Sequence, residues 1–159
     1  MTRIIEGTEL PAGTRVAIIV SRYNDNVTER LLEGALRTAE KRGIAAGDVE
    51  VYRVPGAWEL PLAASAVAHS RAYDAIVCLG AVIKGETTHD EHINRQVSDS
   101  LGQLSLRYSL PIGFGLLTVQ SLEQAMNRAG GTVGNKGEEA TEAALEMVGL
   151  LAHLPEVQG

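Results

Sequence analysis

Cysteine is almost absent from this 159-residue chain, which has Cys78 alone, together with one tryptophan and one phenylalanine. A single cysteine excludes an internal disulfide. Cys78 stands inside the apolar run DAIVCLGAVI, where burial raises the pKa of a thiol. We therefore interpret Cys78 as a small core residue and not as a nucleophile.

The chain also lacks an excess of positive charge. Fourteen Lys and Arg residues stand against twenty Asp and Glu residues, which gives a formal net charge of −6. Such a balance shows no electrostatic footprint for nucleic acid or for an anionic membrane. Any phosphate group that the protein binds must therefore be bound by a local arrangement of residues.

Long hydrophobic runs are absent as well. The first residues, MTRIIEGTEL, contain no apolar core of signal-peptide length, and no run approaches the roughly 18 apolar residues of a membrane span. We expect a cytoplasmic protein. With 45% hydrophobic residues, the sequence predicts one domain over residues 1–159 with a core of ordinary size.

Apolar runs of strand length alternate with helical patterns along the chain. The runs cover residues 15–21, 49–54, 74–83 and 111–119. Helices are predicted after Asn26, from about Trp58, over 89–108, over 121–129 and over 136–152. The first begins with a capping-box pair, Asn26 and Glu29, and stops at Gly43, while Pro61 suits the first turn of the second.

This alternation predicts an α/β fold, a three-layer doubly wound domain with a four-stranded parallel sheet. The runs at 15–21 and 74–83 are apolar nearly throughout, as in parallel strands that helices cover on both faces. Right-handed crossovers favour the strand order 2-1-3-4. The topological switch between the first and third strands then predicts a ligand site in the loops after Ser21 and Ile83.

Residues 1–14 have no place in this domain. An extended arm ahead of the first strand either frays or pairs with the sheet edge of a neighbouring chain. We favour the second alternative, because the predicted sheet has only four strands of its own.

The loop GETTH, residues 85–89, follows the third run. Backbone N–H groups around Glu86 and Thr87, with a threonine hydroxyl, can form an anion cradle at a helix start, although a threonine there can also be a simple N-cap. His89 favours the first interpretation. In the first helical turn it lies beside the positive end of the helix dipole, which suits a group that accepts or relays a proton.

Two further segments contain candidate binding residues, one after the second predicted strand and one between the last two predicted helices. VPGAWELP, residues 54–61, presents Trp58 and Glu59, and Tyr23 follows the first strand. Trp58 and Glu59 can be a packed aromatic and a first-turn acid, or they can bind a flat heterocycle that carries hydroxyl groups. NRAGGTVGNKG, residues 127–137, is either a plain connector or a cationic clamp in which Arg128 suits a phosphate.

The run HDEH, residues 89–92, does not predict a metal site. Two histidines three residues apart lack a third ligand, and HExxH is absent.

Taken together, SRYN, VPGAWELP, GAVIKGETTH, FGLLT, EQAMNRAG and GNKG resemble the lumazine synthase family over nearly the whole chain. The resemblance implies a flavodoxin-like fold. It implies that 5-amino-6-(D-ribitylamino)uracil condenses with 3,4-dihydroxy-2-butanone 4-phosphate to give 6,7-dimethyl-8-ribityllumazine, phosphate and water, without a cofactor. It also implies a homopentamer, and some relatives form a sixty-subunit icosahedral shell.

The resemblance further assigns a role to individual residues. Tyr23 corresponds to the aromatic residue that stacks on the pyrimidine, and His89 to the histidine that transfers protons. Phe114 and Arg128 would come from the adjacent subunit, with Arg128 on the phosphate and Lys136 bordering the ligand. The remaining implied contacts are those of the ribityl and ring segment, the uracil edge and the phosphate loop: Ala57, Trp58, Glu59, Ala81, Val82, Ile83, Glu86 and Thr87.

Two alternatives remain. A related archaeal-type riboflavin synthase would bind no phosphate, and the GETTH loop with Arg128 argues against it. A non-catalytic flavin- or lumazine-binding protein is the second alternative, and the presence of both His89 and Arg128 argues against that one.

Overall fold

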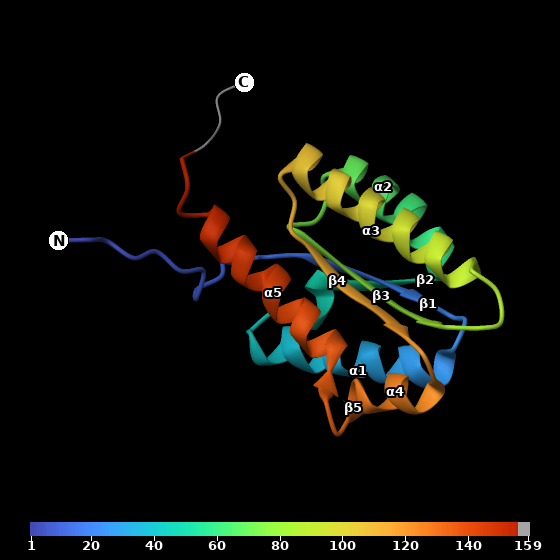
Figure 1. Ribbon diagram of the computed structural model, residues 1–159. Helices are drawn as coiled ribbons and strands as arrows, with labels where there is room; N and C mark the ends of the chain where they lie inside the picture. The colour runs from blue at the N-terminus through green and yellow to red at the C-terminus, as the bar shows by residue number, and fades with distance from the viewer. Residues whose placement is uncertain (156–159) are drawn as a thin grey trace.

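A computed structural model of the chain describes residues 1–155 and contains a four-stranded parallel sheet. Its strands are β1 (Val16–Ser21), β2 (Val49–Val54), β3 (Ala75–Ile83) and β4 (Ile112–Val119). They lie in the order β2-β1-β3-β4, with every neighbouring pair parallel. The predicted fold class and strand order are confirmed (Figure 1).

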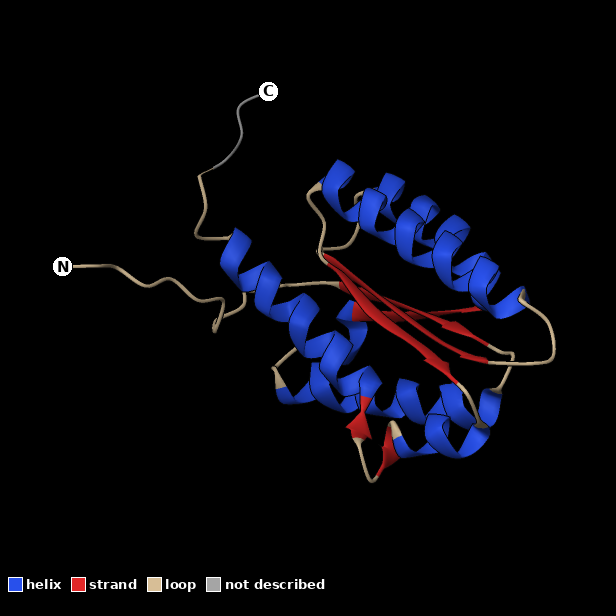
Figure 2. Cartoon of the chain, in the orientation of Figure 1, coloured by secondary structure: helices blue, strands red, loops and turns tan. Residues whose placement is uncertain are grey.

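Helices cover both faces of this sheet (Figure 2). One layer contains α1 (Asp25–Lys41), α4 (Leu122–Asn127) and α5 (Lys136–Leu151), and the other contains α2 (Leu60–Ser70) and α3 (His89–Tyr108). Short 3₁₀ turns, η1 (Ala46–Asp48) and η2 (Ala57–Glu59), precede β2 and α2. Within residues 1–155, none of these helices has the length and apolar character needed to cross a membrane.

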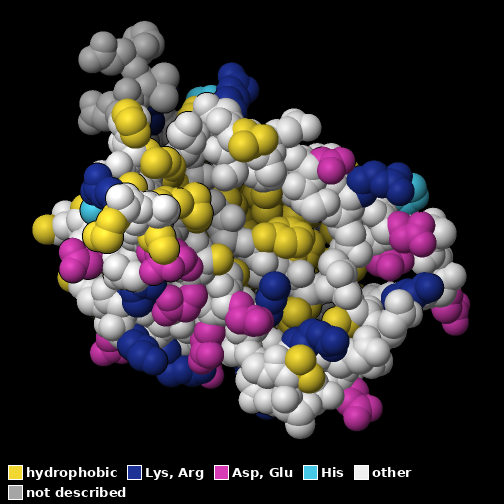
Figure 3. Space-filling view, turned by 60° about the vertical axis from the view of Figure 1, so that its left-hand side comes forward, with side chains coloured by type: hydrophobic (Ala, Val, Ile, Leu, Met, Phe, Trp, Pro, Cys, Tyr) yellow, Lys and Arg dark blue, Asp and Glu magenta, His cyan; other side chains and the backbone are white. Residues whose placement is uncertain are grey.

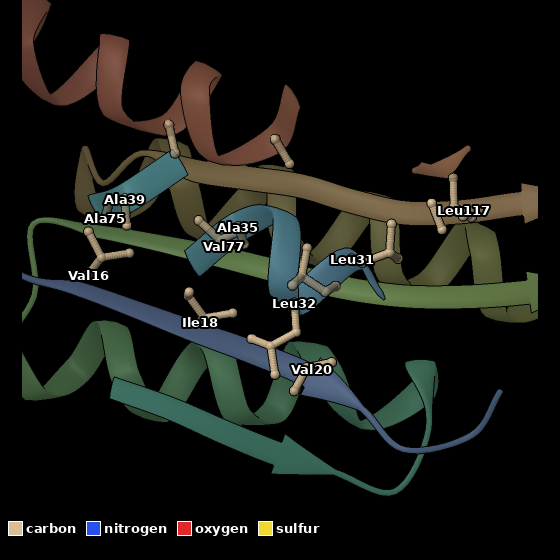
Figure 4. Close-up of a cluster of buried hydrophobic side chains, with 14 of the residues drawn as sticks. Val16, Ile18, Val20, Leu31, Leu32, Ala35, Ala39, Ala75, Val77 and Leu117 are labelled. Atoms are coloured by element: carbon tan, nitrogen blue, oxygen red, sulfur yellow. The ribbon is translucent and has the colours of Figure 1, made fainter. Parts of the chain in front are cut away.

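The two central strands, β1 and β3, form the middle of the core. All six residues of β1 are buried, as are the first eight of β3, so their alternate side chains fill both helix layers. Figure 4 shows the layer between the sheet and α1, where Ile18 and Val77 face Leu31 and its neighbours. Burying each such aliphatic side chain contributes about 1.5–3 kcal/mol. Cys78 is fully buried, and desolvation raises the pKa of its thiol to about 12, which agrees with a core role.

The predicted capping box of the first helix is wrong. Helix α1 already begins at Asp25, so Asn26 lies inside its first turn. The residue before it, Asn24, adopts the left-handed conformation with φ 63°, and its backbone oxygen accepts the first helical hydrogen bonds. Glu29 instead pairs with Arg53 of β2. A tertiary ion pair and a left-handed turn have replaced the local cap.

Helices α1 and α5 touch backbone to backbone at Gly137. A Cβ on Gly137 would lie 2.0 Å from the carbonyl oxygen of Leu31, so only glycine permits this approach. Beside it, the buried Asn135 caps α5, because its Oδ1 accepts from the N–H groups of Gly137 at 2.8 Å and Glu138 at 3.2 Å. Its Nδ2 donates to the carbonyl oxygen of Arg30 at 3.1 Å. These contacts fix the start of α5 on α1.

A small hairpin between α4 and α5 was not predicted. Strands β5 (Ala129–Gly131) and β6 (Gly134–Asn135) pair antiparallel, with Gly130 and Gly134 at positive φ. The segment expected as a connector or clamp is therefore a defined turn.

The N-terminal arm, residues 1–14, forms no strand within this chain. The expectation that it makes no contact with its own domain is wrong in part. A Cβ on Gly149 of α5 would lie 2.7 Å from the backbone oxygens of both Gly7 and Glu9. Gly7 is buried in this contact. Ile4, in contrast, is 81% exposed. The arm thus contacts α5 around Gly7, whereas residues 1–6 are exposed.

Candidate active site

The carboxyl ends of β1 and β3 open into a pocket of about 350 Å³, here called the switch pocket. It lies at the predicted topological switch of the sheet. Loops after β1, β2 and β3 and the first turns of α3 contribute its walls. The lining residues are Tyr23, Asn24, Gly56, Ala57, Trp58, Glu59, Ala81, Val82, Ile83, Gly85, Thr87, His89, Asp90 and Ile93.

The first wall is fixed by contacts between loops. The Tyr23 N–H donates to the Pro55 carbonyl oxygen at 3.0 Å, which ties the loop after β1 to the loop after β2. Asn24 then turns back, and its Nδ2 donates to the Ala81 carbonyl oxygen at 2.9 Å. Because Asn24 sits at positive φ, where asparagine is tolerated better than most residues, the turn and the hydrogen bond require the same residue type.

The aromatic side chains of this pocket are unusually open. Tyr23 is 74% exposed and Trp58 is 55% exposed. Trp58 and Glu59 lie in η2, and Pro61 occupies the start of α2, where its missing N–H costs little. Trp58 is therefore no packed core residue, and its ring is available to a flat ligand.

The GETTH loop, residues 85–89, leads into the start of α3. Helix α3 begins at His89, and the Thr87 hydroxyl oxygen accepts from the His89 backbone N–H at 3.3 Å. The imidazole of His89 makes no hydrogen bond to any residue in 1–155 and lines the pocket. Glu86 is exposed and does not line the pocket, whereas Gly85 and Thr87 on either side of it do.

The other predicted site residues lie in a second pocket along β4, here called the β4-edge pocket, of about 480 Å³. Phe114, Arg128 and Lys136 all line it. The backbone N–H of Lys136 donates to the backbone carbonyl oxygen of Arg128 at 2.8 Å across the β5–β6 hairpin. This bond holds the backbones of the two cationic residues next to each other. This pocket shares no lining residue with the switch pocket. One chain thus carries two separate parts of the predicted site.

An apolar groove, here called the β4 groove, continues from the β4-edge pocket between α3 and α5. Its volume is about 600 Å³, and its lining includes Leu106, Ile112, Phe114, Ala144 and Met147. Leu106 is 84% exposed and Phe114 is 41% exposed. Figure 3 shows hydrophobic side chains gathered in a hollow on this side of the molecule. A patch of this kind on an edge strand is typical of a protein–protein contact.

Besides the glycines Gly56 and Gly85, three residues that line the switch pocket were not among the predicted site residues. These are Asn24, Asp90 and Ile93. The position of Asn24 directly after the first strand was a signal for it. Asp90 and Ile93 lie one turn apart on α3, and the 3.6-residue period of the helix places them on the same side. No group of three or more potential metal ligands exists among residues 1–155.

The fold and the pocket define a doubly wound α/β protein with a pocket at the switch point of its sheet. The sequence pattern of the 6,7-dimethyl-8-ribityllumazine synthase family matches residues 13–152. The 6,7-dimethyl-8-ribityllumazine synthase of Syntrophus aciditrophicus (strain SB) is 46% identical over 154 residues, which cover 97% of this chain and 100% of that protein. The chain belongs to this family.

Proposed function

We propose that the chain uses the switch pocket, completed by the β4-edge pocket of a second copy, to condense 5-amino-6-(D-ribitylamino)uracil with 3,4-dihydroxy-2-butanone 4-phosphate. The reaction is the riboflavin-pathway condensation of its family, and it forms 6,7-dimethyl-8-ribityllumazine with release of phosphate and water. The single observation that carries the assignment of the site is the convergence of Tyr23, Trp58 and His89 on one pocket.

The pyrimidine and its ribityl chain fit the switch pocket. Tyr23 and Trp58 offer exposed aromatic faces for the ring, and the Glu59 carboxylate accepts hydrogen bonds from hydroxyl groups. Backbone groups of Ala81, Val82 and Ile83 lie at the open end of β3, where they can read the uracil edge. The Asn24 contact holds the Ala81 carbonyl in place for that purpose.

The phosphate is assigned to Thr87 and the backbone around Glu86 on one chain and to Arg128 on the next. N–H groups at the start of α3 and a planar guanidinium both suit a phosphate dianion. Lys136 adds a second positive charge beside Arg128. Since the net charge of the chain is −6, this local pair supplies the attraction that the whole molecule does not.

His89 is assigned the proton transfers. The 5-amino group attacks the ketone to give an imine with loss of water. Phosphate then leaves, the enol tautomerises, and the ribityl-bearing nitrogen closes the ring with loss of a second water. Each step moves protons, and one well-placed imidazole contributes about 10²- to 10⁴-fold to such a reaction. No cofactor enters this scheme.

Assembly follows from the division of the site. A closed ring of heterologous contacts lets the β4 face of each chain complete the switch pocket of the next. The apolar β4 groove supports this arrangement, because it would otherwise stay in water. We propose a homopentamer, in which the free residues around Ile4 add to a neighbouring sheet edge.

The short β5–β6 hairpin supports a further step to a sixty-subunit shell, because it presents no long insertion between rings. Light scattering separates the two assemblies. A particle of about sixty times the 16.9 kDa chain supports the shell, and about five times that mass leaves the ring alone. The cytoplasmic location expected from the sequence stays a prediction.

Mixing both substrates with the purified protein tests the function. We expect phosphate release and lumazine fluorescence to rise together. Riboflavin formed from lumazine alone would instead indicate a riboflavin synthase. A yellow protein that shows no turnover would indicate a binding protein.

A further inference from the structure

Glu139 is an acidic residue in the pocket to which the phosphate is assigned. It lines the β4-edge pocket together with Arg128 and Lys136. It also lines the β4 groove, as Phe114 and Lys136 do, so it lies where the two cavities meet. Figure 3 shows that basic and acidic side chains both reach the rim of the hollow on this side of the molecule. A negative charge is therefore present in a pocket that has to attract a dianion.

The three charged residues of this pocket, Arg128, Lys136 and Glu139, form no ion pair within residues 1–155. By contrast, Arg37 and Arg42 each pair with a glutamate of α5. Lys136 and Glu139 lie three residues apart in the first turn of α5, a spacing that puts the Cβ atoms of two helical residues about 5–6 Å apart. Glu139 can thus compete for Lys136, yet it leaves both cations available to a ligand in the resting protein.

An acid in the first turn of a helix can simply complement the helix dipole. Glu138 has that role without any part in the site. It belongs to the same turn of α5, its carboxylate pairs with Arg37 of α1 at 2.9 Å, and it lines neither the β4-edge pocket nor the β4 groove. The dipole therefore explains an acid in this turn, but it does not explain an acid in the phosphate pocket.

We propose that Glu139 sets how tightly the β4-edge pocket holds phosphate, and thereby allows the phosphate product to leave after each turnover. This inference rests on the function proposed above. The substrate enters with a phosphate group, and the reaction leaves inorganic phosphate, which carries a similar charge and is attracted by the same two cations. Glu139 weakens this attraction, because its carboxylate repels the dianion and competes with it for Lys136.

Glu139→Gln removes the charge and keeps the size of the side chain. We expect the KM for butanone phosphate and the inhibition constant of inorganic phosphate both to fall, by about threefold to tenfold. The difference from the wild type should shrink as sodium chloride rises from about 0.05 M to about 1 M, because salt screens exposed charges. Glu139→Asp keeps the charge and should stay close to the wild type.

Glu138→Gln is the matched control, because it removes the same charge from the same turn of α5 outside the pocket. Both constants should stay within about twofold of the wild type in this variant. Trp58 provides a second control, since it is the only tryptophan of the chain and lines the switch pocket. Quenching of its fluorescence by ribitylaminouracil alone should give the same dissociation constant in Glu139→Gln as in the wild type.

Unchanged constants in Glu139→Gln, with an active wild type, would overturn this inference and leave the proposed function standing. A rise in either constant would show that Glu139 positions the cations, and an equal fall in Glu138→Gln would show that any charge lost from α5 has this effect. Either result would overturn the inference, as would loss of the native oligomer mass in Glu139→Gln. A wild type that makes no lumazine would overturn the function itself and this inference with it.

Discussion

His89 lies at the start of α3 with an imidazole that makes no hydrogen bond to any residue in 1–155. A side chain without a hydrogen-bond partner among these residues can exchange protons with a ligand. We predict that His89→Ala slows turnover by between about tenfold and a thousandfold, because general acid–base catalysis is lost. Binding of ribitylaminouracil, followed by Trp58 fluorescence, should be nearly kept. An unchanged rate would remove His89 from the mechanism.

Substitution of Arg128 should have the opposite pattern of effects: weaker binding of butanone phosphate and nearly unchanged binding of ribitylaminouracil. Its guanidinium is assigned to the phosphate, so Arg128→Ala should raise the KM for butanone phosphate by about tenfold or more. The affinity for ribitylaminouracil should change little. Arg128→Lys keeps the charge without the planar fork and should fall between the two. If both substrates lose affinity equally, Arg128 holds the assembly and not the phosphate.

At the scale of the elements, the cap of α5 stabilises the helix whose first residue, Lys136, lines the β4-edge pocket. The Oδ1 of Asn135 accepts hydrogen bonds from two backbone N–H groups of α5, and its Nδ2 donates one to the backbone of α1. The residue is only 5% exposed. Asn135→Ala should lower the free energy of unfolding by about 1–3 kcal/mol, because a cap and a buried hydrogen bond are both lost. Urea unfolding at fixed protein concentration measures this change.

Ser121→Ala is the matched control for Asn135→Ala. Ser121 also caps a helix, but with a single hydrogen bond, from Gln124 N at 3.2 Å. Ser121→Ala should lower the free energy of unfolding by less than Asn135→Ala does, by about 0.5–1 kcal/mol. Equal losses in the two variants would contradict the role given to the Asn135 contact with α1.

The elements also show how far the sequence predicts this fold. Helix α3 was predicted over its full length, His89–Tyr108, because its apolar stripe is regular and its partner is the sheet. The start of α1 was misplaced, because an ion pair between Glu29 and Arg53 and a left-handed Asn24 depend on the neighbouring strand. The β5–β6 hairpin was missed, since Gly130, Gly131 and Gly134 carry no strand pattern.

The sequence likewise predicted some residues of the candidate site and missed others. Residues that follow strand ends, such as Tyr23 and Trp58, were predicted because parallel strands end at one edge of the sheet. Asp90 was missed as a pocket residue, because its place depends on how α3 is rotated against η2. That rotation is set by packing over the whole helix and leaves no local signal. The contact of Gly7 with α5 was missed for a similar reason, since the two are far apart in sequence.

At the scale of the whole molecule, the two pockets of one chain share no residue, so the account requires that neighbouring copies complete each other's site. An active monomer would contradict this. A stronger test uses two variants with lesions in different pockets. His89→Ala damages the switch pocket, and Arg128→Ala damages the β4-edge pocket of the same chain.

The decisive measurement is the rate of lumazine formation after the two variants are unfolded, mixed in equal amounts and refolded together, at a butanone phosphate concentration too low to rescue Arg128→Ala. If the site is shared, random mixing places an intact His89 beside an intact Arg128 at about a quarter of the interfaces, and activity should approach about a quarter of the wild-type rate. Each variant refolded alone should stay near its own low rate. A mixture no more active than the average of the two variants would show that one chain contains the whole site.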